Sequence, residues 1–315
     1  MTRIGLVLGG GGAVGHGFHS GVLAALEDVA GFDARTAEVI VGTSGGATIA
    51  GLVRAGVTGT DLASKATQGP PSPRWERLER RRGARSTTPP AHTPRRAPRS
   101  WTPASPRAVV TAARTRTANS PTVIMSALLP AGPVPTVSTG GPLTNLFPGG
   151  WPTAPLWITA VDLDEGQRVL FGRNGGPTTD VPTAVAASCA LPGWFTPVVV
   201  DNTRYVDGAV WSATNADALD GEQLDLVIIS APLSGTSSVL HWWHRRHLRR
   251  EIHQLRTNGT EVMAIEPSLH DAAVMGPNIM DKRRRAAVTR HTVTAMTHRL
   301  EHGDLAVHRE LLVGH

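Results

Sequence analysis

One pattern near the start of the chain restricts the fold more than any other: an apolar run, a glycine turn and a helix-like segment, which together occur twice. Residues 3–8 (RIGLVL) predict a buried strand, and apolar residues at helical spacing between Val14 and Leu26 predict a helix after the glycines. Residues 38–42 (EVIVG) predict a second strand, followed by an apolar helix that stops near Gly56. Two such units in succession favour a parallel sheet and an α/β fold.

Later segments extend this prediction along the chain. Two β-hairpins are predicted at residues 156–172 and 197–212, because each segment holds two apolar runs around turn residues. The apolar segments 224–230 and 261–267 predict further core strands. Helices are expected at residues 108–120, 122–130 and 181–190, and near 239–255 and 281–300. We therefore expect residues 1–315 to form a single three-layer α/β/α domain with a mainly parallel central sheet.

Residues 70–107 interrupt this pattern. They contain nine Pro, ten Arg and two Glu, with no Lys or Asp. Their net charge of +8, against +6 for the whole chain, leaves −2 for the rest. Such a segment buries too little apolar area to offset the entropy of ordering it, so we expect a disordered insertion that acts as a lid or as a linker. Its arginines suit contact with an anionic membrane, whereas its few aromatic residues argue against binding of nucleic acid.

Composition excludes several other classes of protein. No stretch approaches the roughly 20 consecutive apolar residues that span a bilayer, so a soluble protein is expected. The apolar run near Met1 is too short for the core of a signal peptide. The one cysteine, Cys189, excludes an internal disulfide and suits a reducing compartment. We expect a cytoplasmic location, with or without peripheral contact with a membrane.

The glycine cluster after the first predicted strand is suited to binding an anion. Gly9 to Gly12 let successive backbone N–H groups converge, and the helix behind them adds a partial positive charge. The anion could be a phosphate or the oxyanion of a transition state. Gly10, Gly12 and Gly15 also spell GxGxxG, so a nucleotide-binding oxidoreductase is an alternative, with Asp33 or Glu38 as the ribose ligand.

Ser44 follows the second predicted strand, between Gly42 and Gly46. This spelling, GxSxG, is typical of a sharp strand-to-helix turn that exposes a nucleophilic serine. Acyl transfer needs both such a nucleophile and preorganised donors for the oxyanion, and the two glycine turns together would supply them. A helix start capped by Thr43 or Ser44 is the alternative.

Asp207 is the candidate general base for this serine. It ends a predicted strand, and Gly208 can turn the chain so that the carboxylate projects from the strand end. Apolar neighbours such as Phe195, Tyr205 and Trp211 would make the carboxylate more basic than it is in water. An ordinary Asp-Gly turn is the alternative.

Three segments together resemble the patatin-like phospholipase family. GGGGAVG is similar to its glycine-rich oxyanion loop, GTSGG to its nucleophile turn, and DGA to the motif of its dyad aspartate. The surrounding residues are also similar, notably HSGVLAALED and the segment from Ala190 to Asp217. The similarity covers most of the chain apart from residues 70 to about 130.

The resemblance implies a Ser–Asp dyad rather than a triad. Ser44 would be the nucleophile and Asp207 its base, and an acyl-enzyme would form on a lipid or simple ester without a metal or another cofactor. Further site residues are expected by the same resemblance: oxyanion donors at Gly10, Gly11 and Gly12, and supporting turns at Gly42, Gly46 and Gly208.

One position departs from the family pattern. The family usually has Arg or Lys just before the last glycine of its first loop, and this chain has Val14 there. The resemblance therefore leaves the headgroup preference open, and His16 or His19 could lie near the mouth of the site instead. Packing within the helix is the alternative for both histidines.

A histidine triad is a second alternative for the mechanism. Ser44, Asp207 and His241 run in the chain order of an α/β-hydrolase triad, although that fold normally has several strands before its serine. His241, His244 and His247 are spaced by three, so they could also hold a metal on one helical face. The flanking arginines favour a solvated basic face.

Overall fold

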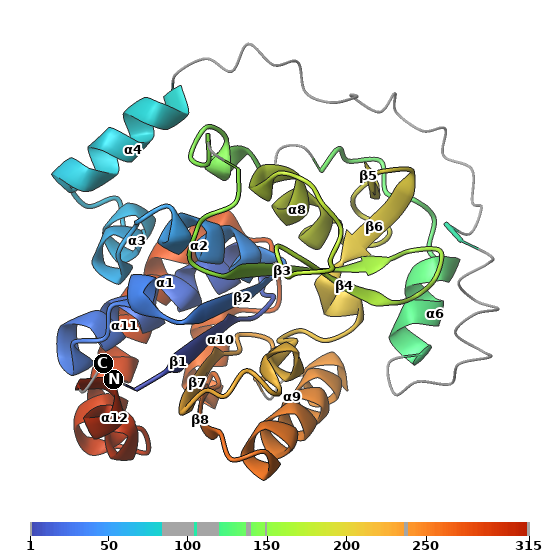
Figure 1. The fold of residues 1–315 in the computed structure, drawn as a ribbon. Helices are drawn as coiled ribbons and strands as arrows, with labels where there is room; N and C mark the ends of the chain where they lie inside the picture. Colours follow the sequence, from blue (N-terminus) through green and yellow to red (C-terminus); the bar gives the residue numbers. More distant parts are fainter. Residues whose placement is uncertain are drawn as a thin grey trace.

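The structure, a computed structural model, describes residues 2–83, 104–105, 120–136, 140–148, 150–235 and 239–313. Its centre is one eight-stranded sheet in the order β5-β6-β3-β2-β1-β7-β8, with β4 paired to β3 (Figure 1). The strands are β1 (Ile4–Leu8), β2 (Val39–Thr43), β3 (Leu156–Asp162), β4 (Arg168–Phe171), β5 (Val198–Val200), β6 (Thr203–Asp207), β7 (Leu226–Ser230) and β8 (Glu261–Ile265).

The pairing of the strands confirms the predicted fold class. Neighbours β3, β2, β1, β7 and β8 are all parallel, whereas β4 and β6 run antiparallel to β3, and β5 antiparallel to β6. The two predicted hairpins are β3–β4 and β5–β6, and both predicted late strands are present as β7 and β8. The sheet is therefore mixed and mostly parallel.

Helices cover both faces of the sheet. They are α1 (Gly12–Ala30), α2 (Gly45–Arg54), α3 (Gly59–Ala66), α4 (Pro73–Gly83), α6 (Ser120–Leu128), α8 (Val181–Ser188), α9 (Val239–Thr257), α10 (Leu269–Met275), α11 (Arg285–His302) and α12 (Arg309–Val313). Among these described helices, none combines the length and the apolar character needed to cross a membrane.

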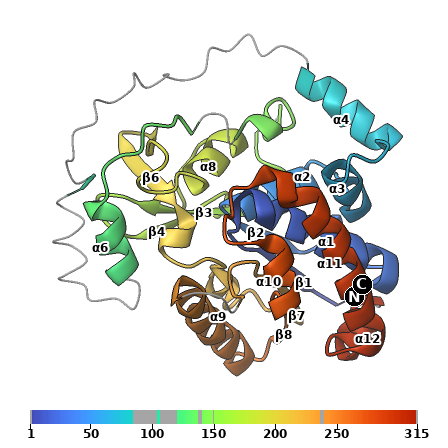
Figure 2. The ribbon, with the colours of Figure 1, turned by 180° about the vertical axis from the view of Figure 1, so that it is seen from behind.

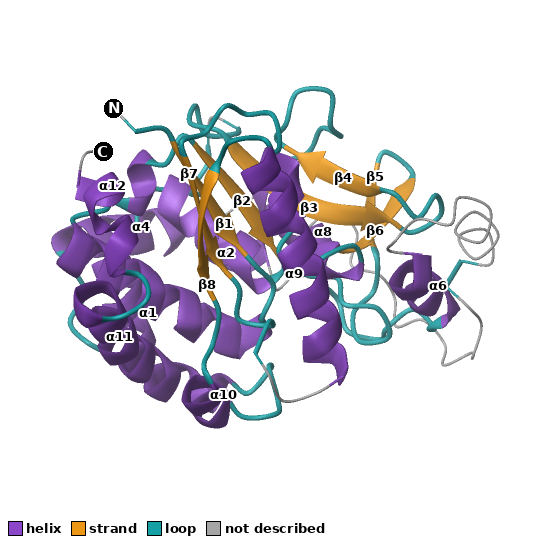
Figure 3. Ribbon diagram, turned by 90° about the horizontal axis from the view of Figure 1, so that it is seen from below, coloured by secondary structure: helices purple, strands orange, loops and turns teal. Residues whose placement is uncertain are grey.

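Alternation along β1 divides the core between the two faces. Ile4, Leu6 and Leu8 belong to a core that includes Phe18 of α1, whereas Val7 belongs to a second core. That second core includes Leu248 and Leu255 of α9. Figure 2 shows α11 lying against α1, and Figure 3 shows α9 on the other side of the strands. The result is the expected three-layer α/β/α arrangement.

The start of the Pro/Arg-rich segment differs from the sequence prediction. Residues Pro73–Gly83 form α4, in which Trp75 and Leu78 are buried. The ammonium of Lys65 lies 5.5 Å from the centre of the Trp75 ring. Disorder is therefore a wrong expectation for residues 73–83, because apolar side chains at helical spacing find partners in the main core. Residues 84–103 and 106–107 of the predicted insertion lie outside the described residues, and so do residues 108–119 of the helix predicted at 108–120.

Parallel strands bring the chemistry-bearing turns to one edge of the sheet. The carboxyl ends of β1 and β2 lead into the glycine loop and into Ser44, and both strands point the same way. The neighbouring strand β7 ends at Ser230, whose carbonyl accepts a hydrogen bond from Gly9 N–H at 3.0 Å. Open α/β sheets place their sites at this carboxyl edge.

Candidate active site

Ser44 occupies a strained turn between β2 and α2. Its backbone has φ 52° and ψ −123°, so a residue with a side chain takes a conformation that normally favours glycine. The turn is possible only because its neighbours are small. A Cβ at Gly46 would overlap the carbonyl of Leu8, and one at Gly42 would lie 2.6 Å from Ala47 Cα. The sharp strand-to-helix turn predicted from GxSxG is therefore present.

Asp207 lies within hydrogen-bond distance of this serine. The Ser44 hydroxyl donates to Asp207 Oδ2 at 2.7 Å, and Ala209 N–H donates to Oδ1 at 2.8 Å. Asp207 ends β6, and the short helix Gly208–Val210 follows it. A Cβ at Gly208 would overlap the Thr159 side chain, so this glycine allows β6 and β3 to lie close together.

The environment of Asp207 makes it a stronger base than an exposed carboxylate. The residue is only 2% exposed. Burial raises the pKa of Asp207 to about 7, although the hydrogen bonds from Ala209 N–H and the Ser44 hydroxyl act in the opposite direction. A carboxyl group with this pKa can accept a proton from an alcohol and return it near neutral pH.

The glycine loop lies directly beside the serine turn. The Cβ position of Gly45 is 2.8 Å from Gly12 O and 3.1 Å from Gly12 N, so only glycine at 45 permits this approach. The N–H groups of Gly11 and Gly12 make no hydrogen bond within the described part of the chain. They lie at the N-terminus of α1, where the partial positive charge of the helix favours an anion.

Gly10 corrects one detail of the predicted oxyanion loop. Its N–H donates to the carbonyl of Ala213 at 2.7 Å, so this donor is already used in the structure. The contact anchors the loop to the segment that follows Asp207. Gly11 and Gly12 are the remaining candidates from the three predicted donors.

Ser188 supports the serine turn and was not found from the sequence. Its hydroxyl accepts a hydrogen bond from Ser44 N–H at 2.8 Å, and it is fully buried at the end of α8. The two residues are 144 positions apart, and no local motif links them. Only the packing of α8 on the sheet reveals the contact.

Asn215 links the residues next to Ser44 and Asp207. It is fully buried, and its side-chain amide donates to Thr43 Oγ1 at 3.1 Å and to the carbonyl of Ser212 at 2.5 Å. A longer contact of 3.3 Å reaches the carbonyl of Gly208. Thr43 precedes Ser44 and Gly208 follows Asp207, so one amide group braces both turns.

Glu251 of α9 binds the segment around Asn215. Its carboxylate accepts from Thr214 Oγ1 at 2.5 Å and from Ala216 N–H at 3.1 Å. Burial, and the nearby charge of Asp217, raise the pKa of Glu251 to about 7. The segment that Glu251 holds includes Ala213, the acceptor for Gly10 N–H, so α9 supports the glycine loop indirectly.

His19 is part of the scaffold and not of the mouth of the site. It is fully buried, with Nε2 2.8 Å from the carbonyl of Gly9 and Nδ1 2.8 Å from Ser230 Oγ. Because a carbonyl can only accept, Nε2 carries the proton and Nδ1 accepts from the serine hydroxyl. Burial lowers the pKa of His19 to about 4, which suits this neutral form.

His16 lies nearer to the serine turn. Its Cδ2 atom is 3.1 Å from the Cβ position of Gly45. Burial and the charge of Arg285 lower the pKa of His16, so the ring is neutral at neutral pH. Arg285 of α11 also directs its Nε to the carbonyl of Ala13 at 3.4 Å. A basic side chain from another helix thus lies close to the first turn of α1, in which Val14 itself is fully buried.

The structure gives no support to the alternatives that involve other residues. Asp33 pairs with Arg35 and Glu38 with Arg3, so each predicted ribose ligand has a partner of its own. The His241 side chain lies outside the described residues, and both Asp207 oxygens already have donors.

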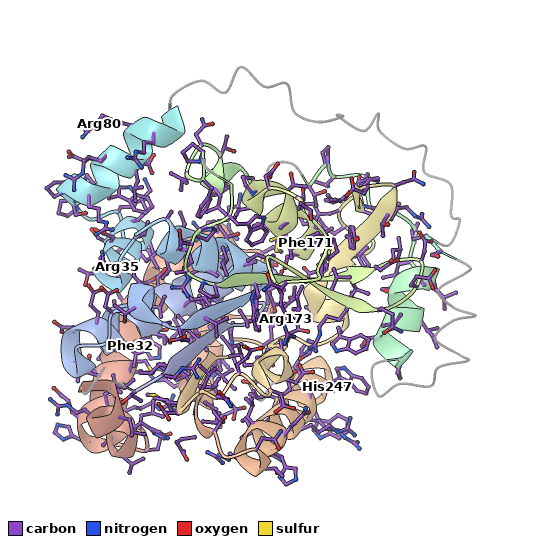
Figure 4. All side chains as sticks on the ribbon, viewed as in Figure 1. Phe32, Arg35, Arg80, Phe171, Arg173 and His247 are labelled. Carbon is purple, nitrogen blue, oxygen red and sulfur yellow. The ribbon has the colours of Figure 1, made fainter. Side chains whose placement is uncertain are left out.

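The histidine-rich turn of α9 is also not the solvated face that the sequence favoured. His244 is 8% exposed and His247 is 6% exposed, and Figure 4 labels the His247 side chain on α9. They are buried because this side of α9 packs on the sheet. Within the described ranges there is no group of three or more His, Cys, Asp or Glu side chains placed to hold a metal ion.

Comparison with known proteins identifies the family. The family model for patatin-like phospholipases matches residues 6–220, which include the glycine loop, Ser44 and Asp207. The crystal structure of VipD from Legionella pneumophila is similar at 11% sequence identity and a TM-score of 0.44, over 96% of this chain and 67% of that chain. The family match extends over more than half of the sequence. The chain therefore belongs to the patatin-like phospholipases, a family of hydrolases of the lipase and esterase kind.

Proposed function

We propose that this protein hydrolyses acyl esters of lipids through a dyad of Ser44 and Asp207. The observation that carries the proposal is the hydrogen bond of 2.7 Å between the Ser44 hydroxyl and the Asp207 carboxylate. The N–H groups of Gly11 and Gly12 beside the same serine, which have no acceptor among the described residues, support it. The family match supports a lipid as the substrate.

In the first half of the reaction, Asp207 Oδ2 takes the proton of Ser44 as Oγ attacks the carbonyl carbon of the ester. The developing oxyanion receives hydrogen bonds from Gly11 and Gly12 N–H, and the helix dipole of α1 stabilises its charge. The tetrahedral intermediate then collapses. The bond to the alcohol oxygen breaks, Asp207 returns its proton to that oxygen, and an acyl group remains on Ser44.

In the second half, water replaces the alcohol. Asp207 removes a proton from this water as its oxygen attacks the acyl carbonyl, and the same N–H groups stabilise the second oxyanion. The bond between Ser44 Oγ and the acyl carbon breaks, and Asp207 returns the proton to Ser44. A free fatty acid leaves. Each step uses only side chains and backbone groups of this chain.

Labelling with a fluorophosphonate probe tests the proposal directly. The probe should form a bond from Ser44 Oγ to phosphorus with loss of fluoride, giving one label per chain. Ser44→Ala should abolish labelling, and Asp207→Asn should slow it by about 10²- to 10⁴-fold, the usual contribution of a general base.

A matched control is Ser64→Ala in α3, whose hydroxyl donates to the carbonyl of Pro70 away from the dyad. This variant should label like the wild type. Labelling that persists in Ser44→Ala would contradict the proposal, and so would an equal loss in Ser64→Ala. Hydrolysis of a dispersed phospholipid by the same variants, measured as fatty acid release, should follow the labelling rates.

A further inference from the structure

The outer face of α9 carries a continuous cationic surface. Trp242, Arg246, Arg249, Arg250 and His253 are all exposed, and their spacing places them in one stripe along the helix. Trp242 is 59% exposed, and the Arg246 guanidinium lies 5.6 Å from the centre of its ring. These residues, together with Arg245, line a shallow groove of about 480 Å³. We call the five residues Trp242, Arg246, Arg249, Arg250 and His253 the α9 surface.

The arginines of the α9 surface have no ion-pair partner among the described residues. Arg245 pairs with Glu266 at 3.3 Å, but Arg246, Arg249 and Arg250 have no ion pair within the described residues. The ranges that the structure does not describe contain no Asp or Glu, so they cannot supply a partner carboxylate side chain. An unneutralised row of guanidinium groups is complementary to an anionic surface.

The α9 surface lies close to the proposed catalytic site. The buried side of α9 places His244 and Leu248 beside Gly9 and Gly10 of the glycine loop. The outer face is therefore about one helix diameter, roughly 10–12 Å, from that loop. Helix α9 follows β7, which ends at the same edge of the sheet as the serine turn, and Figure 3 shows α9 beside the strands. Trp242 belongs to the first turn of this helix.

We propose that the α9 surface docks the protein on an anionic lipid bilayer. The choice of a bilayer as the anionic partner rests on the proposed lipid hydrolysis. The inference that this surface binds an anionic partner rests on its charge alone. Trp242 suits the membrane–water interface, where an aromatic ring with a polar N–H is favoured. A single-stranded nucleic acid would need several aromatic side chains on which successive bases stack, and among the described residues of this face Trp242 is the one exposed Trp, Tyr or Phe. Helix α9 also lies beyond residues 6–220, so the family match does not account for this surface.

Flotation with lipid vesicles tests the proposal. Binding is measured in a Ser44→Ala background, so that the vesicles are not consumed and the result does not depend on catalysis. The protein should bind vesicles of phosphatidylcholine mixed with phosphatidylglycerol, should bind vesicles of pure phosphatidylcholine far less, and should be released by salt. The triple variant Arg246→Gln, Arg249→Gln, Arg250→Gln should lose about a hundredfold in binding, since each basic residue contributes on the order of 1 kcal/mol. Trp242→Ala should reduce the binding that remains at high salt.

The matched control removes three arginines from another exposed helix. Arg77→Gln, Arg80→Gln and Arg81→Gln lie in α4, within the Arg-rich segment for which the sequence also suggested contact with a membrane. Figure 4 labels Arg80 on this helix. The control should bind nearly as well as the parent. Equal losses in both triple variants would overturn the proposal, because net charge alone would then explain binding. Binding to an RNA duplex but not to anionic vesicles, lost in the α9 variant, would overturn it in favour of nucleic acid.

Hydrolysis assays separate this proposal from the proposed function. In the active protein, the α9 triple variant should keep its rate on a short soluble ester and lose rate on anionic vesicles. Loss of both rates with intact vesicle binding would contradict the docking role of the arginines. An inactive wild type that still binds vesicles through α9 would contradict the proposed function and leave the docking proposal standing. Circular dichroism and a single Arg249→Gln variant, with a severalfold loss of binding, guard against a folding defect.

Discussion

The hydroxyl of Ser44 and the carboxylate of Asp207 are in hydrogen-bond contact across 2.7 Å, although 163 positions separate them in the chain. Strand β3 explains how they meet. Thr43 pairs with Thr159 on one side of β3, and Asp207 pairs with Ala160, the next residue, on the other side. The last residues of β2 and β6 thus flank the same point of β3, one in parallel and one in antiparallel register.

The pKa of Asp207 predicts how activity depends on pH. The proposed base works only as a carboxylate, and burial raises the pKa of Asp207 to about 7. Hydrolysis should therefore be slow at pH 5, rise as the pH passes through about 7 and level off above it. The measurement is kcat/KM for a soluble ester as a function of pH. A flat profile down to pH 5 would show that a carboxyl group of ordinary pKa is the base.

The same pKa predicts a cost in stability. The folded pKa of Asp207 lies above its unfolded value of 3.8, so its contribution to stability is full below pH 4 and is lost as the pH rises through about 7. Asp207→Asn keeps donor and acceptor atoms for Ser44 and Ala209 but cannot ionise. At pH 8 it should be more stable than the wild type by a few kcal/mol, as each pKa unit corresponds to about 1.4 kcal/mol.

Urea denaturation at pH 5 and at pH 8 checks this prediction. The gain from Asp207→Asn should be larger at pH 8 and should shrink at pH 5. Ser44→Ala provides the control for loss of the hydrogen bond alone, because it removes the donor without removing the buried charge. A variant that is equally stable or less stable than the wild type at pH 8 would contradict the assignment of a buried charge at Asp207.

A side chain at position 45 should separate the glycine loop from the serine turn. The Cβ of Gly45→Ala would approach Gly12 O to 2.8 Å, so the loop must shift. We expect kcat to fall by about 10²- to 10³-fold, the range seen when an oxyanion donor is lost, with a smaller change in KM. Gly141→Ala is the matched control, because nothing lies within 4 Å of its Cβ position. A loss of the same size in both variants would argue against a specific role for the loop.

Removal of the Ser188 hydroxyl should weaken the serine turn. Ser188→Ala leaves the part-buried Ser44 N–H without its acceptor, and loss of such a hydrogen bond costs about 1 kcal/mol. The variant should unfold at lower urea concentration and should also lose activity, because the turn that positions Oγ relaxes. Ser126→Ala in α6 removes another buried hydroxyl, which donates to the carbonyl of Val123 in its own helix. That control should lose stability without a comparable loss in kcat.

The features that the sequence predicted depend on residues that lie close together in the chain. Apolar runs next to glycines and other turn residues predicted β1, β2 and both hairpins, because each pattern depends on neighbours within a few residues. Gly42, Ser44 and Gly46 predicted a sharp turn for the same reason. The pairing of Ser44 with Asp207 followed from the resemblance to the family, since no spacing rule connects positions so far apart.

Other features depend on contacts between distant elements and were missed for that reason. The sequence placed Gly10 among the oxyanion donors, but its N–H donates to the carbonyl of Ala213, a residue far from Gly10 in the sequence. Neither Ser188 nor Asn215 belongs to a motif, and both act only because α8 and the segment after β6 fold back under the site. Composition alone suggested disorder for residues 73–83, where Trp75 has a place in the core.

The hydrogen bond from Ala209 N–H to Asp207 Oδ1 restricts the order of events in the proposed reaction. With Oδ1 held, Oδ2 is the one atom of this carboxyl group that faces the serine, and it must serve both the alcohol and the water. The incoming water can then be activated only at the position that the departing alcohol has left. The alcohol and the water would therefore use the same Oδ2 atom, one after the other. An alcohol that stays bound there would take back the acyl group before water arrives.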